Sequence, residues 1–400
     1  MQALSDVRVL DLTWYISGPY CTKMLADYGA EVIKVEKPPE GDAARRMGPF
    51  FGDHPHPEKS GLFLHLNTNK RGITLNLKSD TGKKIFKELV KDADILVENF
   101  SPVVMERLGF SYEELEKINP RLVMTSISNF GQTGPYRNFR ATEIVEFAMG
   151  GEMYSTGTPE LTPLKLGGNV IQYQAGTIAA VSTMGALYCS RQQGIGQHID
   201  VSIMETQAGG ADRRNVYLLG YTYGEVLTQR WPGSGTAAVR TLLPRGIYPC
   251  KNGFVMFLGL PQWWTRFLRL LNLEDDSKFQ NFIDTTHEDE FRAIWFSWLA
   301  DHTKEEIFKL CLENRIAGAP LKTVAEVVED QHLKEREFLV EVDHPVVGRI
   351  KYPGAPFKMM ASPWQVKRPA PLLGQHNDEI YIQLGYTKEE LIKLKQEGVI

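Results

Sequence analysis

Cysteine is scarce in this chain, and neither a long apolar run nor an excess of positive charge is present. The four cysteines are scattered without a CxxC pair, which excludes the usual spacing of zinc ligands and the density of a disulfide-stapled scaffold. The sequence contains no stretch of about 20 apolar residues, the length that a membrane-spanning helix needs. No signal peptide is visible at the N-terminus. We therefore expect a soluble cytoplasmic protein with reduced thiols, no metal site and no membrane partner.

Basic residues are slightly outnumbered by acidic ones, with 45 Lys and Arg against 49 Asp and Glu and a net charge of −4. Nucleic-acid-binding proteins usually have a basic excess, so this balance argues against a nucleic-acid partner. The chain is 42% hydrophobic and 10% aromatic, unlike a disordered protein. At about 150 residues per domain, its length predicts two or three globular domains.

The first part of the chain alternates between strand and helix patterns. Helices are expected from Ser17 to about Tyr28 and over Ser79–Asp92. This alternation predicts βαβ units and a parallel sheet of Rossmann type. No GxGxxG motif follows the first strand, so the pattern gives little support to dinucleotide binding. The expected strands are Val7–Leu12, Glu31–Val35, Ile73–Leu77, Ile95–Val97 and Val123–Ser126.

The rest of the chain combines helices with shorter strand pairs. A helix made largely of small residues is expected over Ala175–Arg191 and is followed by a strand. Residues 262–316 are predicted to be mostly helical, with aromatic side chains in a core. The segment Tyr221–Pro244 lacks periodicity and is expected to be mobile or to line a site. The remaining expectations are a hairpin over Gly246–Leu258 with its turn at Lys251-Asn252-Gly253, a strand pair near Val340–Ile350, and a last helix capped at Thr387.

Seven segments, spread from one end of the chain to the other, resemble one known family in that family's order. They are VRVLDLTWYISGPYCTKMLADYGAEVIKVEKPPEGDAARRMGP, NTNKRGITLNLK, LVENFSPVVMERLGF, ISNFGQTGPYRN, GIGQHIDVSIME, ENRIAGAPLKTVAEVVED and APLLGQHNDEI. On these segments the sequence is similar to the family III CoA-transferases, also called the CaiB/BaiF type. The resemblance implies an α/β fold with a large Rossmann-like domain built from both chain ends (residues 1–215 and 323–400), a smaller α+β domain (residues 216–322), and an interlocked dimer.

The resemblance also implies an activity. Members move CoA from an acyl-CoA to a free carboxylic acid, without a permanently bound cofactor, and some relatives isomerise 2-methylacyl-CoA thioesters. CoA carries phosphates and a long pantetheine arm, so it needs cations, donor-rich turns and an apolar slot. Several matching positions lie near ends of expected strands, where open α/β sheets place ligands. The positions that the resemblance assigns to CoA binding are Ile16, Ser17, Lys37, Leu75, Lys78, Asn99, Phe100, Arg107 and Arg140.

One position departs from the family's pattern. The transfer reaction uses an Asp that attacks the thioester, and in the family this Asp lies four residues before a Gly that starts a helix rich in small residues. That Gly is Gly176 here, and Gln172 stands four residues before it. A neutral amide oxygen is a poor nucleophile and cannot form the same anhydride. The sequence has no Asp between Asp94 and Asp200.

A second departure lies in the glycine-rich loop that closes over the intermediate in some members. The matching stretch here, RWPGSGTAAVRT, has only Gly233 and Gly235. The two departures together suggest a chain that kept the fold and lost the chemistry.

These departures lead to three hypotheses. In the first, the chain is the non-catalytic subunit of a hetero-oligomer whose paralogous partner supplies the Asp. It then resembles the Asp-lacking subunit of the succinyl-CoA:benzylsuccinate CoA-transferases of anaerobic toluene breakdown. In the second, it is a self-sufficient homodimer that uses another carboxylate, such as Glu143, which otherwise matches an acidic helper position. In the third, it is a CoA-binding scaffold or regulatory protein. A racemase would need a His–Asp pair, and the sequence has no His between His65 and His198.

Overall fold

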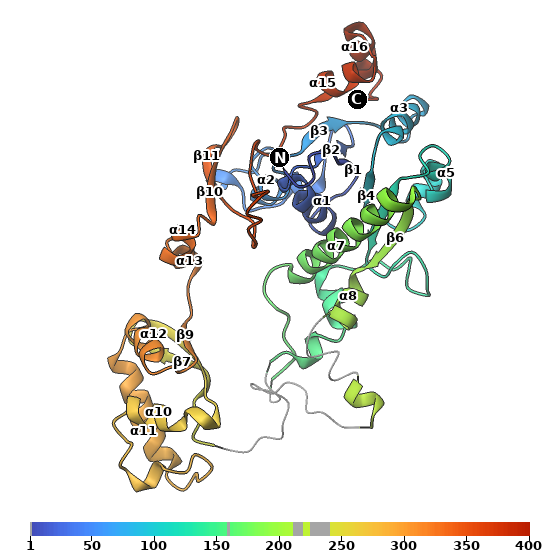
Figure 1. Ribbon diagram of the computed structural model, residues 1–400. Coiled ribbons are helices and arrows are strands. Elements are labelled where there is room, and N and C mark those ends of the chain that lie inside the picture. Colours follow the sequence, from blue (N-terminus) through green and yellow to red (C-terminus); the bar gives the residue numbers. More distant parts are fainter. Residues whose placement is uncertain (1, 158–160, 211–218, 225–240) are drawn as a thin grey trace. The chain divides into compact units, whose positions relative to one another are not determined.

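The computed structural model describes residues 2–157, 161–210, 219–224 and 241–400 (Figure 1). The chain divides into two compact units. One comprises Met1–Met153, Lys165–Val216 and Lys334–Ile400, and the other comprises Tyr154–Leu164 and Tyr217–Leu333. The first unit thus combines both ends of the chain.

The first unit is built on a six-stranded parallel sheet with the strand order β3-β2-β1-β4-β5-β6. The predicted α/β fold is therefore confirmed. The central strands are buried on both faces, which explains their nearly continuous apolar sequences. The order of the strands reverses between β1 and β4, which lie side by side. The strands are β1 (Arg8–Asp11), β2 (Glu31–Glu36), β3 (Arg71–Thr74), β4 (Ile95–Glu98), β5 (Val123–Ser128) and β6 (Gln197–Ser202).

Helices cover both faces of this sheet and create two apolar cores. On one face, side chains of α3 pack with Ile380, Tyr381 and Leu391 from the C-terminal helices. The Tyr381 hydroxyl donates a hydrogen bond to the Thr74 carbonyl (2.6 Å), which anchors the end of the chain to β3. On the other face, α1 and α7 pack together over β1 and β5. The helices of this unit are α1 (Ser17–Asp27), α2 (Gly61–Leu66), α3 (Asp80–Lys91), α4 (Val104–Leu108), α5 (Tyr112–Glu116), α6 (Glu143–Met149), α7 (Val170–Gln193), α8 (Ile203–Gly210), α15 (Asn377–Gln383) and α16 (Lys388–Gln396).

The second unit contains a three-stranded antiparallel sheet and several helices. The predicted hairpin is β7 paired with β8, and β9 adds to the far edge of β8. The aromatic side chains form the predicted core, in which Trp264, Phe267, Phe291 and Trp295 are nearly inaccessible. The elements are β7 (Arg245–Cys250), β8 (Gly253–Leu258), α10 (Trp264–Leu270), α11 (Glu288–Asp301), α12 (Lys304–Glu313), β9 (Gly318–Pro320), α13 (Val324–Val328) and α14 (Gln331–Glu335).

Near the C-terminus, the predicted strand pair and last helix are both confirmed. The pair is β10 (Leu339–His344) with β11 (Gly348–Pro353), and Thr387 forms the predicted capping box at the start of α16. Most of the segment Tyr221–Pro244, expected to be mobile or to line a site, lies outside the described residues. In the described part of the chain, no helix has both the length and the apolar character needed to cross a membrane.

Two predicted elements had the wrong bounds. The third strand is Arg71–Thr74 rather than Ile73–Leu77, because acidic partners neutralise the charges at its start: Lys70 pairs with the buried Asp11, and Arg71 pairs with Glu31 and Glu379. A strand that begins with Arg71, directly after Lys70, does not have the apolar sequence expected of a buried strand.

The long helix also starts earlier than expected, at Val170 instead of Ala175. A carboxylate from another helix accounts for this, because Glu143 accepts a hydrogen bond from the Ile171 backbone N–H (3.2 Å). Gln172 therefore lies in the first turn of α7 rather than before it.

Candidate functional site

The predicted CoA-binding residues follow four adjacent strands of the parallel sheet. Ile16 and Ser17 follow β1, Lys37 follows β2, Leu75 follows β3, and Asn99 with Phe100 follows β4. Because the strands are parallel, these carboxyl ends share one edge of the sheet. The strand order reverses there between β1 and β4, which is where open α/β sheets bind ligands. The structure thus brings these positions to the same edge of the sheet.

These residues differ in what they can offer a ligand. Ile16, Ser17 and Leu75 are buried, so they would act through backbone groups or apolar contact. Lys37 is half-exposed and pairs with Glu40 at 3.0 Å, a weak surface pair that a phosphate could displace. The other three predicted cations are exposed: Lys78 after β3, Arg107 on α4, and Arg140 in the loop before α6.

The loop after β1 is held by side chains from other parts of the chain. The Trp14 N–H donates to Asn99 Oδ1 (2.8 Å), and Asn99 Nδ2 donates back to the Trp14 carbonyl (2.8 Å). The next N–H, that of Tyr15, donates to Asp42 Oδ1 (3.1 Å), and Tyr15 has a φ of 65°. This left-handed conformation is unusual for a non-glycine residue and requires such support. Asn99 therefore bridges β4 and β1 at the point where the strand order reverses.

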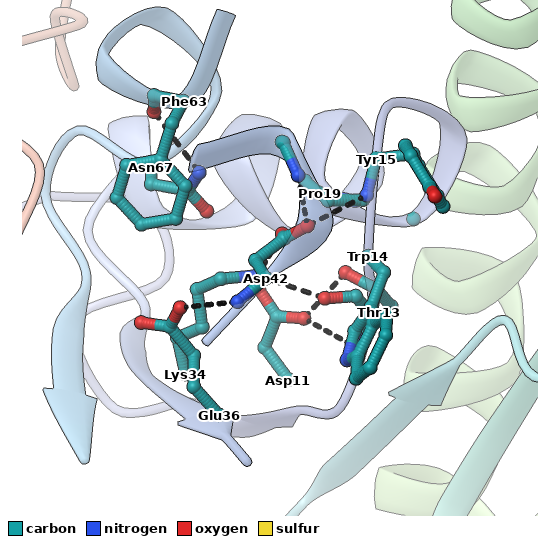
Figure 2. Close-up of polar contacts among 12 residues, drawn as sticks. Asp11, Thr13, Trp14, Tyr15, Pro19, Lys34, Glu36, Asp42, Phe63 and Asn67 are labelled. Atoms are coloured by element: carbon teal, nitrogen blue, oxygen red, sulfur yellow. Dashed lines mark hydrogen bonds and ion pairs between the residues drawn. The ribbon is translucent and has the colours of Figure 1, made fainter. Parts of the chain in front are cut away.

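Buried ion pairs support the same loop from within the sheet. Lys70 Nζ lies 2.9 Å from Asp11, and Lys34 Nζ lies 3.0 Å from Asp42, with all four side chains inaccessible. Lys34 also donates to the Thr13 carbonyl (2.8 Å), and Asp11 accepts from the Thr13 N–H (2.8 Å). Figure 2 shows Asp11, Lys34 and Asp42 converging on this loop. These two ion pairs therefore hold the loop backbone in place without a bound ligand.

Burial of these charges changes their titration. Burial alone would raise the pKa of Asp11, but the ammonium groups of Lys70 and Lys34 and two hydroxyl groups lower it to about 2. Burial lowers the pKa of Lys70 to about 8, against the opposing effect of Asp11. On β4, burial raises the pKa of Glu98 to about 7, and its carboxylate accepts a hydrogen bond from the Phe100 N–H (2.7 Å).

Gln172, at the expected nucleophile position, points its amide at a buried carboxylate. Gln172 Nε2 donates to Glu146 Oε2 on α6 (2.8 Å). The amide of Asn129 donates to the other oxygen of Glu146 (2.8 Å) when its oxygen faces the Ala141 N–H. Burial, reinforced by the charge of Glu143, raises the pKa of Glu146 to about 7. The first turn of α7 thus presents an amide held by a carboxylate, not a carboxylate of its own.

Glu143, the alternative candidate for the nucleophile, lies on α6 and binds the backbone at the start of α7. Its Oε1 accepts from the Ile171 N–H and lies 3.7 Å from Lys165 Nζ. Burial raises the pKa of Glu143 above its usual range. This carboxylate caps α7, a role that accounts for its position without catalysis.

Gly176 sits one turn after Gln172 and allows α1 and α7 to touch. A Cβ atom at this position would lie 2.5 Å from the Ser17 carbonyl oxygen, which is too close for any side chain. The backbone of the expected CoA loop is therefore packed directly on the helix that carries Gln172. The second departure noted in the sequence, at Gly233 and Gly235, lies outside the described residues.

Other features of the first unit do not add to this site. Within the described residues, no group of His, Cys, Asp and Glu side chains is arranged to hold a metal ion. A cavity of about 310 Å³ is lined by residues that include Glu31, Arg71 and Arg368. Glu31 and Arg71 begin β2 and β3, so this cavity lies at the opposite edge of the sheet from the loops described above.

Comparison with known proteins identifies the family. The sequence model of CoA-transferase family III matches residues 4–377. The chain belongs to CoA-transferase family III. Its α/β fold agrees with that assignment, since a CaiB/BaiF family protein from Brucella suis superposes with a TM-score of 0.83 at 25% identity, covering 96% of this chain and 99% of that one. Enzymes of this family use CoA thioesters as substrates.

Several characterised family members are similar to this chain over its whole length. Subunit BbsE of succinyl-CoA:(R)-benzylsuccinate CoA-transferase from Thauera aromatica is 31% identical, with 100% of this chain and 98% of BbsE covered. Succinyl-CoA–D-citramalate CoA-transferase from Chloroflexus aurantiacus is 32% identical (99% and 98% covered). Formyl-CoA:oxalate CoA-transferase from Streptomyces coelicolor is 34% identical (100% and 99% covered). Their acids differ, so family membership leaves the acid substrate open.

Sequence reasoning missed several residues of this candidate site. Asp42, Lys34 and Asn129 were not singled out, and their roles depend on contacts with distant segments. Glu146 was interpreted from the sequence as a surface or structural carboxylate, and it is buried. It carried one signal of its place beside Glu143: it lies three residues later on a helix, and that spacing places two side chains on one face.

Proposed function

We propose that this chain is the non-catalytic subunit of a hetero-oligomeric CoA-transferase whose paralogous partner supplies the Asp nucleophile. The observation that carries the proposal is Gln172. It occupies the family's nucleophile position, and its amide is hydrogen-bonded to Glu146. Glu143, the nearby alternative, is occupied as the cap of α7. This chain would keep the CoA edge of the sheet and shape the shared assembly.

Two relatives support a choice of substrates to test first. Both BbsE and the citramalate enzyme are named for succinyl-CoA, and BbsE is named as a subunit. We therefore propose succinyl-CoA as the acyl donor and a dicarboxylic acid such as benzylsuccinate as the acceptor. The exposed cations Lys37, Lys78, Arg107 and Arg140 are proposed to face the CoA phosphates.

The surface of α7 supports a partner chain. The helix is rich in apolar and small residues around its whole circumference, although one side of it is open to solvent. A helix that is apolar all round is normally buried. Val181 and Tyr188 are 68% and 66% exposed, and Val170 and Ile178 are exposed on the same helix. The partner subunit is proposed to cover this face in an interlocked arrangement.

We expect Val181→Asp to weaken association with the partner by about tenfold or more. A carboxylate placed in an apolar contact must be desolvated without a partner group. Analytical ultracentrifugation of the co-expressed pair measures the effect. The matched control is Ile392→Asp on α16, where an apolar side chain is 57% exposed. Equal assembly of Val181→Asp and the wild type would show that this face is not the contact.

The decisive experiment measures CoA transfer from succinyl-CoA to benzylsuccinate by the purified chain, alone and with its co-expressed Asp-bearing paralogue. Because this chain lacks the nucleophile, we expect transfer only with the paralogue, at least about a thousandfold above the chain alone. Activity of the isolated chain would refute the proposal and make Glu143 the first residue to replace. CoA binding without transfer and without a co-purifying paralogue would favour a scaffold or regulatory role.

A further inference from the structure

We propose that Glu146 is the positioning residue of this site: its buried carboxylate holds the Gln172 amide, and the same charge prevents a carboxylate at position 172 from acting as a nucleophile. The inference rests on the proposed non-catalytic role and extends it. The loss of the nucleophile then involves two positions, Glu146 on α6 and Gln172 on α7, and both must change to restore it.

The contacts of Glu146 show that its carboxylate is built into the fold. The side chain is fully buried, and each of its oxygens faces an amide donor at 2.8 Å, one from Gln172 and one from Asn129. Two amide donors suit a carboxylate, because hydrogen bonds to the charged form stabilise it. The amide of Gln172 is thereby fixed in the first turn of α7.

The same geometry is unfavourable for an Asp at position 172. Gln172→Asp shortens the side chain by one methylene but leaves two carboxylates within the range of about 4–6 Å over which like charges shift each other's pKa. Glu143, one turn earlier on α6, adds a third acid, and its own charge already acts on Glu146. Lys165 faces Glu143 at 3.7 Å, while α7 and the loop at Asn129 face Glu146 with uncharged amides. The two neighbouring acids must therefore share one proton. Because Asn129 donates a hydrogen bond to Glu146 and not to position 172, the charge stays on Glu146 and the proton on the new acid.

A protonated acid cannot perform the family's first step. In that step a carboxylate oxygen attacks the thioester carbonyl carbon, the C–S bond breaks, and CoA leaves as a thiolate that takes a proton from water. The product is a mixed anhydride between the acyl group and the side chain. Glu146→Gln removes the repelling charge while keeping the shape, and its amide can donate to the new carboxylate. We therefore expect the pair of changes to restore a step that Gln172→Asp alone does not.

The test compares Gln172→Asp, Glu146→Gln and the double variant in the assembled protein. Each is assembled with a paralogue whose nucleophilic Asp is replaced by Asn, so that only this chain can form an adduct. The assembly is mixed with succinyl-CoA at pH 7, and free CoA and the acyl adduct are measured by thiol titration and mass spectrometry. We expect at least tenfold more adduct in the double variant than in Gln172→Asp, and none in Glu146→Gln. Equal adduct in Gln172→Asp and the double variant would overturn the inference. No adduct in either would overturn it too, because Glu146 would then not be what keeps a carboxylate at position 172 from reacting.

A second measurement requires no CoA and separates this inference from the proposed function. If Glu146 raises the pKa of the new acid, the folded state holds an extra proton, so stability is lost as pH rises through the raised pKa. Between pH 5 and 8, the Tm of Gln172→Asp should fall by about 2 °C or more relative to the neutral isostere Gln172→Asn. The double variant should not show this fall, and an equal fall in both would count against Glu146. Failure of the wild-type assembly to bind CoA would instead contradict the proposed function and leave this comparison valid.

Discussion

Lys70→Met should lower the free energy of unfolding by about 3–5 kcal/mol, the cost of leaving a buried charge without its partner. The substitution keeps an unbranched side chain of similar length, so the main loss is the charge beside Asp11, 2.9 Å from Lys70 Nζ. Lys70 also donates to the Pro19 carbonyl (3.0 Å), which lies in the first turn of α1. The change should therefore loosen the start of α1 as well as β3. Urea unfolding followed by circular dichroism measures it.

The matched control is Lys91→Met, which removes a cation from an exposed pair with Glu88. That change should alter stability by no more than about 0.5 kcal/mol. The pH dependence adds a second criterion. Asp11 has a pKa near 2 in the folded protein, below its ordinary value, so its contribution to stability is present above pH 4 and is lost as pH falls towards 2. In Lys70→Met the loss should begin at a higher pH. Equal unfolding of the two variants would contradict the importance of the buried pair.

Asn99→Ala should weaken CoA binding by about tenfold to a hundredfold and should lower Tm as well. The change leaves both the N–H and the carbonyl of Trp14 without partners, at about 1–3 kcal/mol for each group that stays buried. Trp14 also contacts the Phe100 ring edge-on at a centroid distance of 6.3 Å. The loop after β1 would therefore keep this ring contact but lose both of its hydrogen bonds to Asn99. Titration calorimetry with CoA and thermal unfolding together measure the effect.

Asn99→Asp is the informative companion variant. It keeps an oxygen for the Trp14 N–H but loses the donor to the Trp14 carbonyl, so its effects should be intermediate. If Asn99 acted only by touching CoA, affinity would fall while Tm stayed unchanged. That outcome would contradict the role in holding the loop, whereas a joint fall in both quantities would support it.

Much of the fold could be predicted from local sequence patterns. Alternating apolar runs indicated the parallel strands, Thr387 with Glu390 indicated the start of α16, and the apolar periodicity before Asp92 indicated α3. These signals work because hydrophobic period and capping are properties of neighbouring residues. The errors arose where a distant side chain changed the local rule: Glu143 extended α7 at its start, and Asp11 allowed β3 to begin beside a buried lysine.

The sequence by itself determined the family, and it predicted that Gln172 stands at the nucleophile position, since both can be read from residue types in order along the chain. It could not show what surrounds Gln172. Only the tertiary structure brought Glu146, 26 positions away, to the amide of Gln172, and joined Asn99 to Trp14 across 85 positions. The physical reason is that a buried polar group must find a partner wherever the packed chain supplies one. Such pairings depend on how helices and strands pack, so short-range sequence patterns cannot predict them.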